Sequence, residues 1–123
     1  MAVDEKPHRK LKVWQASMDF VIELYKELQS LPAHEKYGLI GQLQRAAVSI
    51  PSNIAEGAAR KNTRELLQFL YSARGSLSEL DTQLEICFRL GYLEKNRYES
   101  IAINLEAISR MLNGLMASLF RKV

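Results

Sequence analysis

One apolar seam constrains the fold of this chain more than any other feature of its sequence. Between positions 66 and 87 the interval between apolar residues alternates between four and three. The seam consists of Leu66, Leu70, Ala73, Leu77, Leu80, Leu84 and Cys87. This spacing places the side chains along one side of an α-helix and is typical of helices that pack lengthwise against others. Asn62 is a favourable N-cap, with Glu65 at the reciprocal position three residues later, and Gly91 ends the helix.

Two further segments share this period. The first helix presents Leu11, Trp14, Met18, Val21, Tyr25 and Leu28 on one face and ends at Pro32. The last presents Tyr98, Ile101, Leu105, Ile108, Leu112, Leu115 and Leu119. One more helix lies between the first helix and the helix that carries the seam. Four helices joined by short connections favour an all-α, up-down-up-down antiparallel four-helix bundle.

That second helix, from about Ala33 to about Ala58, contains a proline. Its apolar residues keep helical phase on both sides of the proline: Leu39, Leu43, Ala46, Ile50, Ile54 and Ala58. A loop has no reason to keep this period. Because Pro51 removes the hydrogen bond to the Ala47 carbonyl, at a cost of roughly 3 kcal/mol in an ordinary helix, we expect one helix bent at Pro51.

Length and composition indicate one domain. The chain has 123 residues, 47% of them hydrophobic, so we expect a flexible basic arm at 1–10 and a single four-helix-bundle domain at 11–123. No uncharged run approaches the roughly 18 residues of a membrane span, and the N-terminal segment lacks an apolar signal core. The lone cysteine, Cys87, fits a reducing cytoplasm.

The antiparallel topology gathers basic residues at one end of the bundle. The start of the first helix, the connection between the second and third, and the end of the fourth meet there. We call this end the basic pole and define it by Lys6, Arg9, Lys10, Lys12, Arg60, Lys61, Arg64, Arg121 and Lys122. Such a pole can bind phosphates through counterion release, or it can serve solubility alone. Both alternatives stay open from the residues alone.

Two polar stripes form candidate interfaces with a second copy or a protein partner. The stripe on the second helix consists of Gln42, Arg45, Ser49, Asn53 and Glu56. The stripe on the third helix consists of Tyr71, Arg74, Ser78, Asp81 and Glu85. A solvated face is the alternative interpretation. Phe20 and Leu24 lie off the apolar stripe of the first helix, where they widen the core or join a self-association surface.

Catalytic and metal-binding patterns are missing from the sequence. His8 and His34 lie far apart, and Cys87 lies on the core seam without a histidine base in view. Gly75 lies inside the third helix, where we expect it to allow close helix packing rather than to bind phosphate. The sequence therefore predicts no enzyme, cofactor, metal site, small-molecule substrate or membrane contact.

Two segments carry a resemblance to a known family. The segments EKYGLIGQLQRAAVSIPSNIAEG, at 35–57, and FLYSARGSLSELDTQLE, at 69–85, resemble the 23S ribosomal RNA intervening-sequence proteins, which are bacterial four-helix bundles. The resemblance extends from about Leu11 to Leu119 and implies a homo-oligomeric ring, with a pentamer expected, and an association with RNA.

Two functional hypotheses follow. The first is a non-enzymatic homo-oligomeric bundle that contacts structured RNA or other nucleic acid through the basic pole. The second is a protein-interaction scaffold that works through the polar stripe of the second helix, with no nucleic-acid role.

Overall fold

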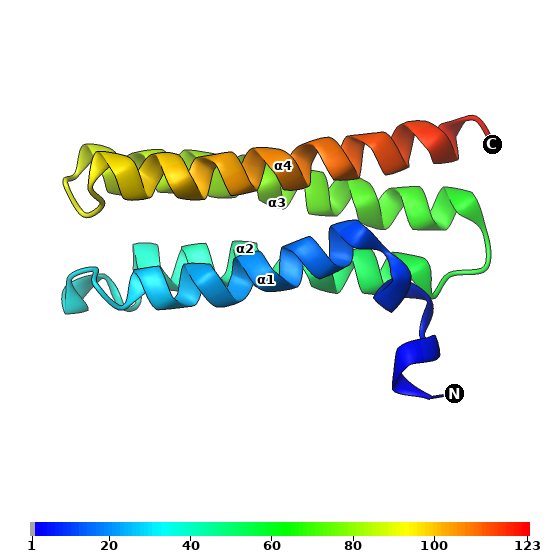
Figure 1. The fold of residues 1–123 in the computed structure, drawn as a ribbon, viewed down its shortest axis with the longest axis horizontal. Coiled ribbons are helices and arrows are strands. Elements are labelled where there is room, and N and C mark those ends of the chain that lie inside the picture. The colour runs from blue at the N-terminus through cyan, green and yellow to red at the C-terminus, as the bar shows by residue number, and fades with distance from the viewer. Residues whose placement is uncertain (1) are drawn as a thin grey trace.

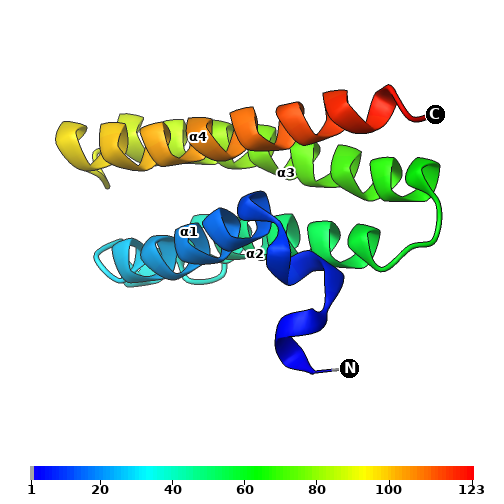
Figure 2. The same ribbon diagram turned by 45° about the vertical axis from the view of Figure 1, so that its right-hand side comes forward.

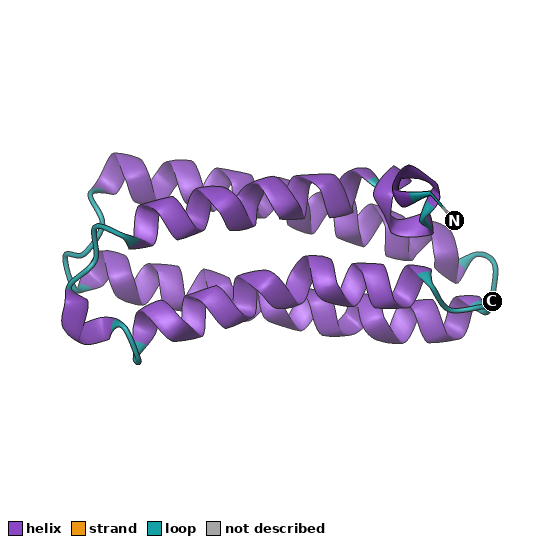
Figure 3. Ribbon diagram, turned by 90° about the horizontal axis from the view of Figure 1, so that it is seen from below, coloured by secondary structure: helices purple, strands orange, loops and turns teal. Residues whose placement is uncertain are grey.

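The chain folds into four long helices. The computed structural model describes residues 2–123, without the side chain of Asp4; Met1, part of the expected arm, lies outside the described residues. The helices are α1 (Lys12–Leu28), α2 (Leu39–Ala58), α3 (Thr63–Arg89) and α4 (Lys95–Phe120). Three short 3-10 helices are η1 (Val3–Glu5), η2 (Pro7–Lys10) and η3 (Ala33–Glu35). Figure 3 shows only helices and loops in the described part of the chain. The predicted all-α class is confirmed.

Successive helices lie side by side and run in opposite directions. Figure 1 shows α1 and α2 as one layer and α3 and α4 as the other, with the α2–α3 connection at the end where both chain termini lie. Around the bundle, α1 contacts α2 and α4, and α3 contacts α2 and α4. The core between them is built from buried Leu, Ile, Val, Ala, Phe, Met and Cys side chains.

The buried face of α1 differs from the predicted one. Its buried residues are Val13, Ser17, Phe20, Leu24 and Leu28. Met18 and Tyr25, expected in the core, are 38% and 39% exposed, whereas Phe20 and Leu24 are buried. A serine can occupy this core position because its hydroxyl donates to the Val13 carbonyl at 2.6 Å, which removes the penalty for burying an unpaired polar group. The predicted apolar stripe of α1 therefore lies closer to the surface than the face that α1 buries.

Helix α2 begins later than predicted and continues through the proline. Ala33–Glu35 form η3, and Gly38, with φ −105° and ψ −115°, lies outside the helical region, so the regular helix starts at Leu39. Pro51 is inside α2 and buried. The Ser49 hydroxyl donates to the Ala46 carbonyl at 2.7 Å, one residue before the carbonyl that Pro51 leaves without its helical partner. The bend itself stays a prediction.

A different glycine from the predicted one allows close packing. A Cβ atom on Gly75 would meet nothing within 4 Å, so the expectation for that residue was wrong. Gly57, near the end of α2, is instead buried against α3. Further along the same contact, the Ser49 and Ser76 hydroxyls form a hydrogen bond between α2 and α3.

Both ends of α3 are capped as the sequence predicts. Asn62 Oδ1 accepts a hydrogen bond from the Glu65 N–H at 2.8 Å. At the other end Gly91 has φ 81°, and the Tyr92 N–H donates to the Cys87 carbonyl at 2.9 Å. This is the six-to-one bond of a Schellman motif, which favours glycine because the backbone is left-handed there. The first cap fixes where the α2–α3 loop ends, and the second fixes where the α3–α4 loop begins.

Candidate nucleic-acid interface

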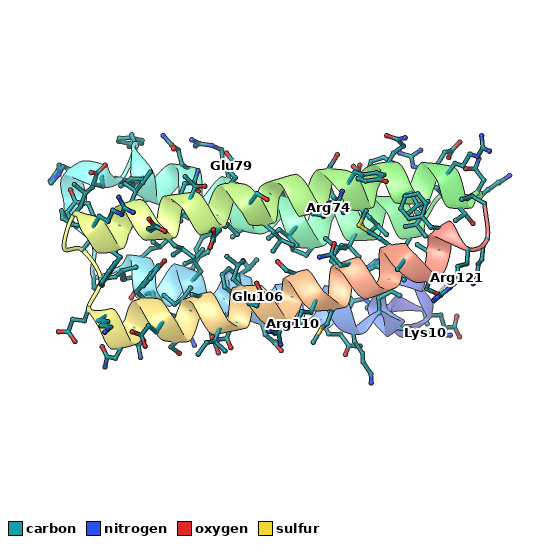
Figure 4. All side chains as sticks on the ribbon, turned by 90° about the horizontal axis from the view of Figure 1, so that it is seen from above. Lys10, Arg74, Glu79, Glu106, Arg110 and Arg121 are labelled. Atoms are coloured by element: carbon teal, nitrogen blue, oxygen red, sulfur yellow. The ribbon has the colours of Figure 1, made fainter. Side chains whose placement is uncertain are left out.

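Three segments of the chain bring the basic pole together. Figures 1 and 2 show η2 with the start of α1, the α2–α3 connection, and the end of α4 at the same end of the molecule. Figure 4 labels Lys10 and Arg121 there. Arg9 is half-buried and the other eight side chains of the pole are exposed. In the described part of the chain, ion pairs involve bases outside this set: His34, Arg89, Lys95, Arg97 and Arg110. Eight of the nine side chains of the pole therefore face solvent, and none of the nine forms an ion pair with an acidic side chain that the structure describes.

Two of the pole's arginines are held over aromatic rings. The Arg9 guanidinium carbon lies 5.2 Å from the Trp14 ring centroid, and that of Arg60 lies 4.7 Å from the Phe69 centroid. Each such contact contributes about 0.5–1 kcal/mol at an exposed site. Each arginine therefore occupies one face of its ring. Sequence reasoning missed Phe69, which lies three residues beyond the Leu66 seam position and showed no signal of this contact.

The η2 segment, directly before α1, is folded against the bundle. Gln15 Nε2 donates to the Arg9 carbonyl at 2.7 Å, and the His8 ring meets Trp14 edge-on at 4.8 Å. Burial against this surface, then the charges of Arg9 and Lys6, lower the pKa of His8. His8 is therefore neutral at pH 7 and adds no charge to the pole. In Figure 2, η1 projects away from the bundle beyond η2. The flexibility expected for residues 1–10 stays a prediction.

The two polar stripes lie over different grooves. On α2, Ser49 bonds Ser76 of α3, and Asn53 Nδ2 donates to the Ser49 carbonyl at 2.8 Å, so this stripe borders α3. The α3 stripe borders α4 instead. Arg74, Ser78 and Asp81 line a groove of about 440 Å³ with residues of α4, and the Tyr71 ring meets Phe120 of α4 at 6.1 Å. The structure does not bring the two sets onto one face, and their role as interfaces stays a prediction.

A hydrogen-bonded cluster lies at the opposite end of the bundle. The Tyr92 hydroxyl, in the α3–α4 loop, donates to Glu35 Oε2 at 3.0 Å, and the Leu39 N–H donates to Glu35 Oε1 at 3.3 Å. The hydrogen bond to Glu35, more than burial, raises the pKa of Tyr92. One carboxylate thus joins the loop before α2 to the loop before α4, an arrangement that stabilises this end of the fold.

The chain offers little chemistry beyond charge. Burial, with a smaller contribution from Glu35, raises the pKa of Cys87 to about 11, so its thiol stays protonated at neutral pH. Within residues 2–123, no three His, Cys, Asp or Glu side chains gather as metal ligands. The same range contains no helix that is long and apolar enough to cross a membrane.

Comparison with known families supports the resemblance seen in the sequence. The family model described as 23S rRNA-intervening sequence protein matches residues 9–114. The chain belongs to this family. The match spans six basic residues of the pole and ends before Arg121 and Lys122. Among curated proteins, none matches the chain.

One solved structure has the same fold. It is a protein of unknown function from the S23 ribosomal protein family of Bacteroides thetaiotaomicron. It superposes with a TM-score of 0.76 at 24% identity, covering 85% of this chain and 97% of its own. Neither the family nor this neighbour carries the name of an enzyme.

Proposed function

We propose that this 23S rRNA-intervening sequence protein is a non-enzymatic cytoplasmic protein that binds structured RNA through the basic pole. The observation that carries the proposal is the meeting of nine basic side chains, from three separate segments, at one end of the bundle. Eight of them are exposed, and no acidic side chain neutralises them within the described residues.

The proposed mode of binding is contact with phosphates. Each phosphate neutralised by a lysine or arginine releases counterions, so affinity falls with salt by roughly 0.7–0.9 logarithmic units per contact for each decade of salt concentration. Arg9 and Arg60 each occupy one face of Trp14 and Phe69, so phosphate contact rather than base stacking is the proposed mode. The pole therefore recognises the shape and charge of a folded RNA or other nucleic acid.

The test is a salt series of binding to a structured RNA hairpin and to duplex DNA. The variant carries Arg60→Glu, Lys61→Glu and Arg64→Glu in and beside the α2–α3 loop. Its matched control carries Lys36→Glu, Arg89→Glu and Lys95→Glu at the opposite end, with the same change in net charge. Loss of binding in the Arg60, Lys61 and Arg64 variant alone supports RNA binding at the basic pole. Equal loss in both, or no binding by the wild type at low salt, contradicts it.

We propose further that the protein self-associates. The family resemblance implies this, with a pentamer as the expected state, and a ring with parallel axes would bring several basic poles onto one rim. Sedimentation or light scattering of the purified protein measures the number of subunits directly. A monomer at all concentrations would remove the rim from the proposal but leave the RNA contact testable on its own.

The alternative, a scaffold acting through the α2 stripe, has less support. Ser49 and Asn53, at the centre of that stripe, already form hydrogen bonds within the chain. The scaffold predicts that Asn53→Ala or Glu56→Ala breaks partner capture, and that reversal of the pole charges has no effect.

A further inference from the structure

The groove between α3 and α4 has the size of a small-molecule site. Its volume is about 440 Å³, and ligand pockets in proteins span roughly 300–1,000 Å³. Leu77 of α3 and Leu105 of α4 lie at its base, where each is 3% exposed. Polar side chains from both helices surround this base and include Arg74, Ser78, Asp81, Glu106, Ser109 and Asn113. The groove therefore combines an apolar floor with a polar rim.

The charges of the groove are separated along its length. Arg74 and Asp81 lie seven residues apart on α3, which corresponds to two helical turns or about 10 Å. Figure 4 labels Arg74 nearer to the basic pole than Glu106 of α4. Because α3 starts at the pole, Asp81 and Glu106 both lie farther from it than Arg74. The groove thus has a basic end and an acidic end.

The charges at the two ends are available to a ligand. In the described residues, Arg74 and Asp81 form no ion pair. The Arg74 guanidinium carbon lies 4.9 Å from the centroid of the Tyr71 ring, a contact that leaves its N–H groups free to donate. Glu106 is paired with Arg110 at 3.5 Å, but both side chains are exposed and water competes with the pair. Asp81 is therefore the stronger site for a cation.

We propose that this groove binds a short extended peptide whose two termini are free. Its carboxylate meets the guanidinium of Arg74, whose donors match the two oxygens of a carboxylate. Its ammonium meets Asp81, with the Glu106 carboxylate at the same end. About three residues, at roughly 3.3–3.6 Å each, cover the distance between the two charges. The inference assigns a ligand to the α3 stripe and does not depend on RNA binding at the basic pole.

The experiment measures binding of the tripeptide alanyl-leucyl-alanine to the full chain by saturation-transfer NMR, which detects weak ligands whatever the size of the protein assembly. Three further probes carry an acetylated amine, an amidated carboxylate, or both. For the wild type, removal of either charge is expected to weaken binding about two- to fivefold, as for a partly exposed ion pair. The doubly capped peptide should bind most weakly.

Two variants assign each terminus of the peptide to its partner. In Arg74→Gln the free and the amidated peptides should bind equally, while acetylation still weakens binding. In Asp81→Asn the free and the acetylated peptides should bind equally, while amidation still weakens binding. Arg74→Lys keeps the charge and should restore the preference for a free carboxylate. A purely structural role of Arg74 would not separate the two ends of the peptide in this way.

Glu79→Gln is the matched control, because Glu79 is exposed on α3 and does not line the groove (Figure 4). It should retain both preferences, and a circular dichroism spectrum verifies the fold of each variant. Equal binding of all four probes by the wild type, or no binding of the free peptide, overturns the proposal. A preference for the free carboxylate that persists in Arg74→Gln also overturns it. RNA binding is measured without peptide, so failure of either proposal leaves the other standing.

Discussion

Gly57 of α2 lies directly against Leu66 of α3: a Cβ atom at position 57 would come within 2.9 Å of Leu66 Cδ1. It would also lie 2.9 Å from Phe69 Cβ and 3.2 Å from the Leu66 carbonyl oxygen. Two of these three atoms belong to the backbone or are bonded to it directly, so they cannot move without moving α3. The absence of a side chain at position 57 therefore sets how closely α2 and α3 approach beside the basic pole.

Gly57→Ala is predicted to destabilise the fold. Alanine gains up to about 1 kcal/mol in helix propensity, but crowding in a packed contact costs about 1–3 kcal/mol, so we expect a net loss in the free energy of unfolding. Urea denaturation followed by circular dichroism measures it. The matched control is Gly75→Ala, where a methyl group meets open space and a gain of about 0.5–1 kcal/mol is expected. A change of the same sign in both variants would contradict this account.

The Asn62 cap is predicted to hold the start of α3. Asn62→Ala removes the acceptor of the Glu65 N–H and should lower the free energy of unfolding by about 1 kcal/mol. Asn62→Gly should cost only a few tenths of a kcal/mol. Chemical denaturation compares both with Asn113→Ala, a change at an exposed position inside α4, which should not destabilise. An equal loss for alanine and glycine at position 62 would argue against the cap.

Cys87 is predicted to make stability fall in alkali. Burial raises its pKa from 9.0 to about 11, so the neutral thiol is favoured in the folded chain. Between these pH values the unfolded chain binds fewer protons than the folded one, so the free energy of unfolding decreases as pH rises. The contribution of the neutral Cys87 thiol to the free energy of unfolding is complete below pH 9 and lost above pH 11. Denaturation at several pH values should show a flatter slope for Cys87→Ala than for the wild type.

The reactivity of the Cys87 thiol tests the burial of this side chain independently. A thiol-specific chromogenic reagent at pH 8 should react slowly with the native protein and rapidly in denaturant, because the side chain is fully buried in the fold. Ser72→Cys in the Cys87→Ala background supplies an exposed control that reacts at once. Rapid reaction of native Cys87 would refute its burial.

Trp14 is predicted to report on the segment that precedes α1. It is the only tryptophan, and Arg9 and His8 of η2 cover it. Removing residues 1–10 should therefore shift its fluorescence emission to longer wavelength, as should Arg9→Ala. Lys10→Ala, an exposed neighbour, should leave the emission unchanged. If none of the three changes alters the spectrum, η2 does not rest on Trp14 in solution.

The sequence predicted the fold well where one periodic pattern dominated. The α3 seam, Asn62 and Gly91 each carry a local signal that tertiary packing does not override, and all three occur as expected. On α1 two apolar stripes compete, and the true one is interrupted by Ser17. Periodicity ranks a serine as a surface residue, and only the Val13 carbonyl beside it explains its burial.

The glycines illustrate a second limit. Gly57 and Gly75 both occur inside predicted helices, and nothing local distinguishes them; the difference lies in what α3 places opposite each one. The basic pole was predictable, because it follows from helix order alone. The separation of the two polar stripes was not, because it depends on how far each helix is rotated about its own axis, which the polar residues do not determine.

Both ends of the polypeptide emerge beside the basic pole, whereas the Gly91 turn lies at the far end (Figure 1). A domain fused to either terminus would therefore be delivered to the proposed RNA contact, where it shields the pole or brings a second activity to the same ligand. A domain attached through the Gly91 turn would leave the basic pole accessible. The choice of tethering site thus decides whether a fusion competes with the pole or cooperates with it.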